Sequence, residues 1–200
     1  MHRYRGLAVL VRSYRGMYFK LIERRTDMLQ LILGGARSGK SRLAESLASG
    51  SGLEVVYIAT SQPVDGELNL RVALHRERRP DSWGLIEEPI ELARVLRENA
   101  RPDCCLLVDC LTLWLTNLLM LEDPARLAQE REALLDCLAQ LPGEIIFVSN
   151  ETGLGVVPLG ELTRRYVDEA GLLHQALAER CQRVVLTVAG LPLTLKGSAL

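Results

Sequence analysis

The sequence predicts a doubly wound α/β domain built on a mostly parallel β-sheet. Three features predict it: short apolar runs, segments of helical spacing between them, and a glycine-rich turn that joins the first run to the first helix. Nearly continuous apolar runs are typical of parallel strands that are covered on both faces. Right-handed crossovers are expected between consecutive strands. The expected strands are Leu29–Leu33, Glu54–Ala59, Cys104–Val108, Glu144–Val148 and Arg183–Val188.

The helices between these strands have recognisable beginnings. Pro89 begins one helical pattern, and Asp123 followed by Pro124 is typical of an N-cap and the first helical residue. A third helix is expected from about Leu159 to Cys181. Helices placed between buried strands complete the expected α/β arrangement.

The glycine-rich turn has the spacing of a phosphate-binding loop, G-x-x-x-x-G-K-S. Its glycines allow the backbone to wrap around an anion, and the helix that follows adds the positive end of its dipole. Lys40 is expected to reach the β- and γ-phosphates and Ser41 to bind Mg²⁺, so the domain is expected to be P-loop NTPase-like. The alternative is a chance glycine turn between a strand and a helix. The turn consists of Gly34, Gly35, Ala36, Arg37, Ser38, Gly39, Lys40 and Ser41.

Small or polar residues follow several of the expected strands. In open α/β sheets, ligands bind beyond the carboxyl ends of the strands. Thr60-Ser61-Gln62, Asp109 and Ser149-Asn150-Glu151 occupy that position. An apolar strand that ends in an acid, as Leu106–Asp109 does, is the usual Mg²⁺-binding strand of phosphate-loop enzymes. A flexible Gly-x-Gly loop at 153–155 suits a large substrate, although it also fits a plain connecting turn.

The segment from Glu67 to Pro80 combines one histidine with several arginines. A helix there would place Arg71, His75 and Arg78 on one stripe. Like-charge repulsion from the arginines would keep the imidazole neutral, and a neutral imidazole is a nucleophile. Arginines around it would hold a polyphosphate leaving group. The alternative is a solvated basic helix with an incidental histidine.

Composition limits the classes of partner. The 200 residues are 48% hydrophobic and 24% charged, which is ordinary for a globular domain, and no apolar run approaches the length of a membrane helix. The net charge is −1, and residues 1–27 carry seven Lys and Arg against two acids, so the remainder is acidic and does not suggest a nucleic-acid partner. Five cysteines without C-x-x-C spacing indicate neither a disulfide framework nor a zinc site, and favour the cytoplasm.

Residues 1–27 differ from the rest of the chain, being rich in arginine and poor in acids. Three interpretations remain: a loosely attached basic extension, a targeting segment, or upstream sequence translated from an early start codon. The position of Met28 at the beginning of the first strand favours the third. The expected organisation is therefore an extension, 1–27, and a single catalytic domain, 28–200.

Several strings, in this order, resemble one enzyme family. They are GGARSGKSRLAE, YIATSQ, the Arg71–Trp83 segment, LLVDCLTLWLTNLL, VSNETGLGVVP, YVDEAG and VAGLPLTLK. The chain resembles the bifunctional adenosylcobinamide kinases/adenosylcobinamide-phosphate guanylyltransferases of cobalamin synthesis. The resemblance extends from Met28 to Gly197 and leaves out the extension.

The resemblance implies a two-step activity. ATP or GTP phosphorylates the aminopropanol hydroxyl of adenosylcobinamide, and GMP then passes from GTP through a histidine to the new phosphate. By motif position that histidine would be His75, and the nucleotide contacts would be Thr60, Ser61, Gln62, Arg76, Glu77, Arg78, Arg79, Glu87 and Asp109. Asp109 would keep its metal role beside Ser41. The resemblance also implies a homotrimer and a corrinoid site near the Asn150–Gly155 loop. His174 departs from the family, which usually carries asparagine there.

Two other functions remain to be distinguished from this one. The first is a phosphate-loop kinase of small molecules without guanylyl transfer. The second is a nucleotide-dependent regulator that binds ATP or GTP without chemistry. His75 among its arginines argues against the first, and the ordered strings that follow the loop argue against the second.

Overall fold

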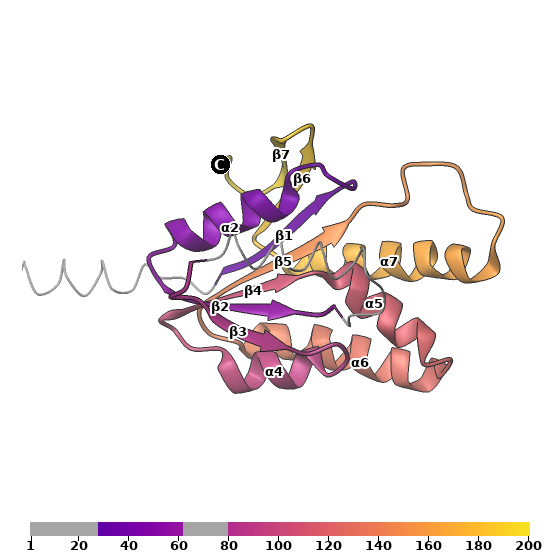
Figure 1. Ribbon diagram of the computed structural model, residues 1–200, viewed down its shortest axis with the longest axis horizontal. Helices are drawn as coiled ribbons and strands as arrows, with labels where there is room; N and C mark the ends of the chain where they lie inside the picture. The colour runs from indigo at the N-terminus through magenta and orange to yellow at the C-terminus, as the bar shows by residue number, and fades with distance from the viewer. Residues whose placement is uncertain (1–27, 62–79) are drawn as a thin grey trace, which may run out of the picture.

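The computed structural model describes residues 28–61 and 80–200 (Figure 1). A single seven-stranded sheet has the order β3-β2-β4-β5-β1-β6-β7. The strands are β1 Met28–Gly34, β2 Glu54–Ala59, β3 Gly84–Glu87, β4 Cys104–Asp109, β5 Glu144–Asn150, β6 Arg183–Val188 and β7 Leu191–Lys196. The helices are α2 Lys40–Gly50, α4 Leu92–Asn99, α5 Leu111–Met120, α6 Pro124–Cys137, the 3₁₀ turn η1 Leu138–Gln140, and α7 Glu161–Arg180.

The five predicted strands are confirmed and pair in parallel, as β1, β2, β4, β5 and β6. Two further strands were not predicted. The four residues of β3 are mostly exposed, so they form no buried apolar run. Strand β7 pairs antiparallel with β6 and carries Pro192, which is tolerated at the edge of a sheet. The prediction of a mostly parallel sheet is therefore confirmed, and the one antiparallel strand lies at an edge.

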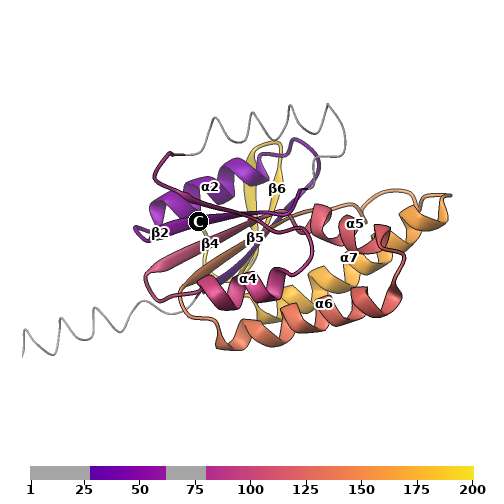
Figure 2. The same cartoon turned by 60° about the horizontal axis from the view of Figure 1, so that its bottom comes forward.

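The helices cover the two faces of the sheet unequally (Figures 1 and 2). In the described part of the chain, α2 packs on one face and buries Ala44 and Ala48 against a smaller apolar cluster. Helices α4 to α7 cover the other face, where Trp114 and Phe147 lie in the larger cluster. Neighbouring strand residues point to opposite faces, so Leu31 joins the larger cluster and Ile32 the smaller.

The predicted helix beginnings at Asp123 and near Pro89 agree with α6 and α4. The Asp123 carboxylate accepts hydrogen bonds from the backbone N–H groups of Ala125 at 3.0 Å and Arg126 at 3.2 Å, so it caps α6. The third predicted helix agrees with α7. Helix α5 was not predicted, because its apolar residues lie on all sides. No helix within 28–61 or 80–200 has the length and apolar character needed to span a bilayer.

Candidate active site

The phosphate-binding loop lies between β1 and α2 at the carboxyl end of the sheet. Gly39 precedes α2 with φ of +96°, and Arg37 also adopts a left-handed conformation with φ of +56°. Gly35 O accepts hydrogen bonds from Ser38 N and from Lys40 Nζ, each at 3.2 Å. The loop therefore folds back on itself and begins a helix at Lys40, which is the geometry that binds a phosphate group.

The turn between β6 and β7 supports this loop. Gly190 N donates to Ser38 O at 2.8 Å. The contact is close, since a Cβ built on Gly39 would come within 3.2 Å of the Gly190 Cα. The string VAGLPLTLK, which had no assigned role, thus holds the backbone of the phosphate loop in place. The sequence gives no sign of this contact, because it depends on the pairing of β1 with β6, which lie far apart along the chain.

Gly34 and Gly35 provide a matched pair for testing the loop. A Cβ on Gly34 would lie 2.4 Å from Ser38 Oγ and 2.6 Å from the Thr187 carbonyl oxygen, whereas a Cβ on Gly35 meets nothing within 4 Å. We expect Gly34→Ala to lower the free energy of unfolding by about 1–3 kcal/mol through overpacking. Gly35→Ala should change it by less than about 0.5 kcal/mol. Urea denaturation without nucleotide measures both, and equal losses would contradict the predicted clash.

Lys40 and Asp109 both act on one thiol. Asp109 ends β4 and Cys110 follows it. The pKa of Cys110 is raised to about 11, chiefly by burial, with the Asp109 carboxylate adding to the rise and the Lys40 ammonium opposing it. Both charges therefore lie within electrostatic range of the Cys110 thiol.

The donor set at this point suits Mg²⁺. Ser41 lies in the first turn of α2 and Asp109 at the end of β4, offering a hydroxyl and a carboxylate. Mg²⁺ prefers oxygen ligands and is usually held by one or two carboxylates together with substrate phosphates and water. Within the described residues, no group of three or more His, Cys, Asp and Glu side chains could hold a metal ion.

Thr60 follows β2 and is fully buried. Its hydroxyl donates to Cys110 O at 2.6 Å and accepts from Cys110 N at 3.0 Å. The Asn117 amide group donates to Thr60 O at 2.7 Å. Thr60 therefore joins the end of β2 to the residue after Asp109, and its hydroxyl is already satisfied by protein atoms.

Glu87 lies at the opposite end of this edge from the loop. It ends β3, beside Ala59 of β2, and it is exposed. Four strand spacings of about 4.8 Å separate β3 from β1, so roughly 19 Å lies between Glu87 and Gly34 along the sheet. Ser61, half-buried, lies between them. The sites expected at Gln62, His75, Arg76, Glu77, Arg78 and Arg79 fall outside the described residues.

The end of β5 also lies at the carboxyl edge of the sheet, next to the phosphate-binding loop. Asn150 is in register with Gly34, and Glu151 N donates to Gly34 O at 3.1 Å. Ser149 Oγ lies 2.8 Å from His174 Nε2 of α7, and both side chains are buried. His174 therefore anchors the strand just before Asn150.

His174 makes stability depend on pH. Burial lowers the pKa of His174 below 6.5, while Glu151 opposes that shift. As the pH falls below 6.5, the unfolded chain binds a proton that the native imidazole resists, so acid lowers the free energy of unfolding. We expect His174→Asn, which cannot titrate, to gain stability relative to the wild type between pH 7.5 and 5.5. Urea denaturation of both proteins across that pH range tests this prediction. A difference in the free energy of unfolding that does not change with pH would refute it.

Comparison with known proteins decides the family. The family model described as "Cobinamide kinase / cobinamide phosphate guanyltransferase" matches residues 30–195. The chain belongs to this family. The match includes the phosphate loop, Asp109 and the β6–β7 turn.

Two curated relatives of this family member carry matching names. The "Bifunctional adenosylcobalamin biosynthesis protein CobP" of Pseudomonas aeruginosa is 70% identical over 173 residues, 86% of this chain and 100% of the relative. The "Bifunctional adenosylcobalamin biosynthesis protein CobU" of Escherichia coli K12 is 36% identical over 182 residues, 84% of this chain and 100% of the relative.

Among solved structures, a Pyrococcus horikoshii OT3 protein is similar with a TM-score of 0.53 and 9% identity, covering 90% of this chain and 92% of that one. At that identity the likeness concerns the fold alone. The parallel sheet and the glycine-rich loop before α2 agree with the expected P-loop NTPase-like class.

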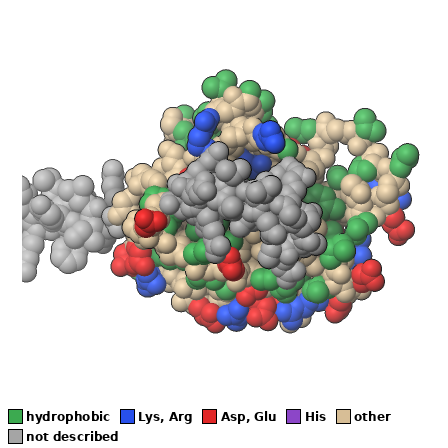
Figure 3. Space-filling model, in the orientation of Figure 1, with side chains coloured by type: hydrophobic (Ala, Val, Ile, Leu, Met, Phe, Trp, Pro, Cys, Tyr) green, Lys and Arg blue, Asp and Glu red, His purple; other side chains and the backbone are tan. Residues whose placement is uncertain are grey.

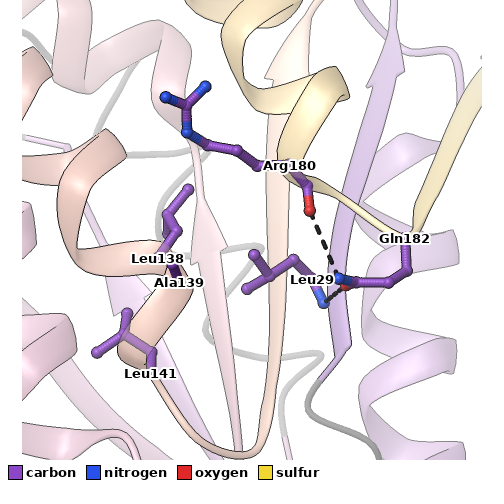
Figure 4. A pocket seen from close by; sticks show the side chains of 6 residues that line it. All are labelled: Leu29, Leu138, Ala139, Leu141, Arg180 and Gln182. Atoms are coloured by element: carbon purple, nitrogen blue, oxygen red, sulfur yellow. Dashed lines mark hydrogen bonds between the residues drawn. The ribbon is translucent and has the colours of Figure 1, made fainter.

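A cavity at the other end of the sheet does not belong to this site (Figure 4). It measures about 330 Å³ and is lined by Leu29, Leu138, Ala139, Leu141, Arg180 and Gln182. Leu29 lies at the amino end of β1, and Gln182 precedes β6. Ligands of open α/β sheets bind at the carboxyl ends, where Gly34, Asp109 and Asn150 lie.

Proposed function

We propose that this chain phosphorylates the aminopropanol hydroxyl of adenosylcobinamide with ATP or GTP, and then transfers GMP from GTP to that phosphate. The product is adenosylcobinamide-GDP. The observation that carries this proposal is the family match over residues 30–195, which includes an ordered phosphate-binding loop. The relatives are named bifunctional adenosylcobalamin biosynthesis proteins, which is consistent with two activities in one chain.

In the first step, the substrate hydroxyl oxygen forms a bond to the γ-phosphorus, and the bond to the β,γ-bridging oxygen breaks. The nucleoside diphosphate leaves, and the hydroxyl proton is released. Lys40 and the backbone N–H groups of the loop hold the phosphates, and Ser41 and Asp109 would hold Mg²⁺. When bound, Mg²⁺ neutralises charge on the phosphate oxygens.

In the second step, a ring nitrogen of His75 forms a bond to the α-phosphorus of GTP, and pyrophosphate leaves. A phosphate oxygen of adenosylcobinamide phosphate then attacks that phosphorus, and the bond to nitrogen breaks. A neutral imidazole beside arginines suits this chemistry, because its lone pair is free and cations hold the leaving pyrophosphate. We assign these cationic and nucleotide contacts to Arg76, Glu77, Arg78 and Arg79.

Two of the remaining nucleotide contacts, Ser61 and Glu87, lie toward the far end of the sheet edge. We assign Ser61, Gln62 and Glu87 to the guanine nucleotide, since Glu87 lies about 19 Å from the loop by strand spacing. Thr60 would contact the nucleotide through its backbone or position the neighbouring residues that do, because its hydroxyl is hydrogen-bonded to the Cys110 backbone.

Product analysis tests the proposal. Purified protein is incubated with adenosylcobinamide, ATP, GTP and Mg²⁺, and the corrinoids are separated by chromatography. We expect adenosylcobinamide phosphate to appear first and adenosylcobinamide-GDP to follow. Accumulation of the phosphate alone would indicate a simple kinase. No phosphorylated corrinoid at all would refute the proposal.

We also propose a homo-oligomer, a trimer by family resemblance, that resides in the cytoplasm. Apolar residues exposed on the edge strand β7 support an interface, since Leu191, Leu193 and Leu195 are each more than half exposed. All five cysteines are free, which fits a reducing compartment. Light scattering coupled to size-exclusion chromatography measures the oligomeric state, and a monomer at micromolar concentration would contradict the trimer.

A further inference from the structure

Several buried polar atoms of the described residues lack hydrogen-bond partners, among them Ser38 Oγ of the phosphate loop and Thr187 Oγ1 of β6. Two others lie on β5 and α7. They are Asn150 Oδ1 and the Tyr166 hydroxyl, and no residue within 28–61 or 80–200 bonds to either. Buried polar groups in folded proteins are nearly always paired, so unpaired ones mark places where a partner comes from elsewhere. The two atoms come from different elements, β5 and α7.

Thr112 brings these two groups together. Its hydroxyl accepts a hydrogen bond from Asn150 N at 2.8 Å. Burial raises the pKa of Tyr166, and the nearby hydroxyls of Thr112 and Thr152 oppose that shift, although neither makes a hydrogen bond of normal geometry with the phenol. Thr112 lies in the first turn of α5, three residues after Asp109. The cluster therefore adjoins the proposed metal site.

The cluster also adjoins the phosphate-binding loop. Asn150 is in register with Gly34, the first residue of the loop, and Glu151 N bonds to Gly34 O at 3.1 Å. Neighbouring parallel strands lie about 4.8 Å apart, so Asn150 is one strand spacing from the loop. A group held by Asn150 and Tyr166 would lie beside a nucleotide bound there.

An apolar loop continues outward from this cluster. Between β5 and α7 the chain stands away from the helices, and hydrophobic side chains project from it (Figures 1 and 3). Val156 is 97% exposed and Leu159 96% exposed, and Leu154 and Val157 are also exposed. Exposed apolar residues in such a group mark a binding surface. The unpaired polar atoms lie near the phosphate-binding loop, and the apolar residues lie farther out. This arrangement suits a phosphoryl acceptor that carries a terminal hydroxyl on a large, partly apolar ring system.

We propose that Asn150 and Tyr166 form the subsite for the hydroxyl-bearing arm of the phosphoryl acceptor, and that the 152–160 loop contacts its macrocycle. This inference rests on the proposed kinase activity. Asn150 Oδ1 accepts the O–H or amide N–H of the arm, and the Tyr166 phenol bonds to the hydroxyl oxygen or the amide carbonyl. These bonds orient the hydroxyl toward the γ-phosphate.

Steady-state kinetics of Asn150→Ala and Tyr166→Phe test the subsite. The second change removes one oxygen and keeps the ring, which packs against the core. We expect each variant to raise the KM for adenosylcobinamide about 10-fold, the effect of one lost hydrogen bond. The KM for ATP and the labelling of the enzyme by α-³²P-GTP should stay unchanged, since neither involves the acceptor. Tyr57→Phe, on the other face of the sheet, is the matched control.

The outcomes separate the subsite from the proposed function. A wild-type enzyme that does not phosphorylate adenosylcobinamide refutes the proposed function. If the wild type is active and both variants keep the wild-type KM for the corrinoid, the subsite is refuted. A rise in the KM for ATP equal to that for the corrinoid also refutes it, because it indicates general damage to the loop.

Discussion

Lys40→Ala is expected to reduce phosphate transfer to adenosylcobinamide by about 10²–10³-fold, the usual effect of removing one donor that stabilises transition-state charge. Lys40 is the first residue of α2 and directly follows Gly39, which has a left-handed conformation. The loop backbone therefore positions its ammonium group to contact the phosphates. It reaches Gly35 O at 3.2 Å, and it acts electrostatically on Cys110 beside Asp109. The measurement is the initial rate of corrinoid phosphorylation with γ-³²P-ATP.

Arg42→Ala is the matched control for this loss of charge. Arg42 is exposed, lies two residues further along the same helix, and extends toward Gly190 of the β6–β7 turn. It should keep phosphate transfer within a few-fold of the wild type. Comparable losses in the two variants would mean that the net charge of the helix end matters, and not the position of Lys40. Thermal unfolding of both proteins shows whether the fold is intact.

His75→Ala is expected to abolish the covalent labelling of the protein by α-³²P-GTP. The proposed second step forms a bond between the imidazole and the α-phosphorus, so the label should be released by acid and retained in base. Removing the nucleophile leaves no atom to accept GMP. Phosphorylation of adenosylcobinamide should continue in this variant, because Lys40, Ser41 and Asp109 remain in place.

His2→Ala is the control, since His2 lies in the extension outside the family match. It should be labelled as strongly as the wild type. Label that persists in His75→Ala would show that another residue accepts GMP. Loss of both labelling and phosphorylation in His75→Ala would contradict the separation of the two steps.

The buried strands could be predicted because burial on both faces leaves a continuous apolar run in the sequence. Edge strands leave no such run. In β3 only Ile86 is partly buried, and β7 alternates exposed leucines with Pro192 and Thr194. The position of the loop, of Asp109 and of Asn150 along one edge followed from the rule that parallel strands end together.

Side-chain partners far apart in sequence could not be predicted. Thr60 was expected to contact nucleotide, yet its hydroxyl bonds to Cys110, fifty residues away. No role was expected for the polar residues of LTLWLTNLL, although Thr112 and Asn117 hold Asn150 and Thr60. Polar side chains in an otherwise apolar helix were the available signal, since buried polar groups need partners.

His174 shows the same limit at a single residue. The sequence marked it as a departure from the family's asparagine, and the structure places it against Ser149 at 2.8 Å. A ring nitrogen can occupy the place of an amide group in such a contact. The substitution therefore leaves a polar partner for Ser149, one residue before Asn150.

The most direct test is to locate GMP on the wild-type protein. Purified enzyme is incubated with GTP and Mg²⁺ without corrinoid, digested under neutral or basic conditions, and analysed by mass spectrometry. The account predicts one added GMP on the peptide that contains His75, removed when adenosylcobinamide phosphate is supplied. GMP on a peptide without His75, or no modified peptide despite measurable formation of adenosylcobinamide-GDP, would contradict it.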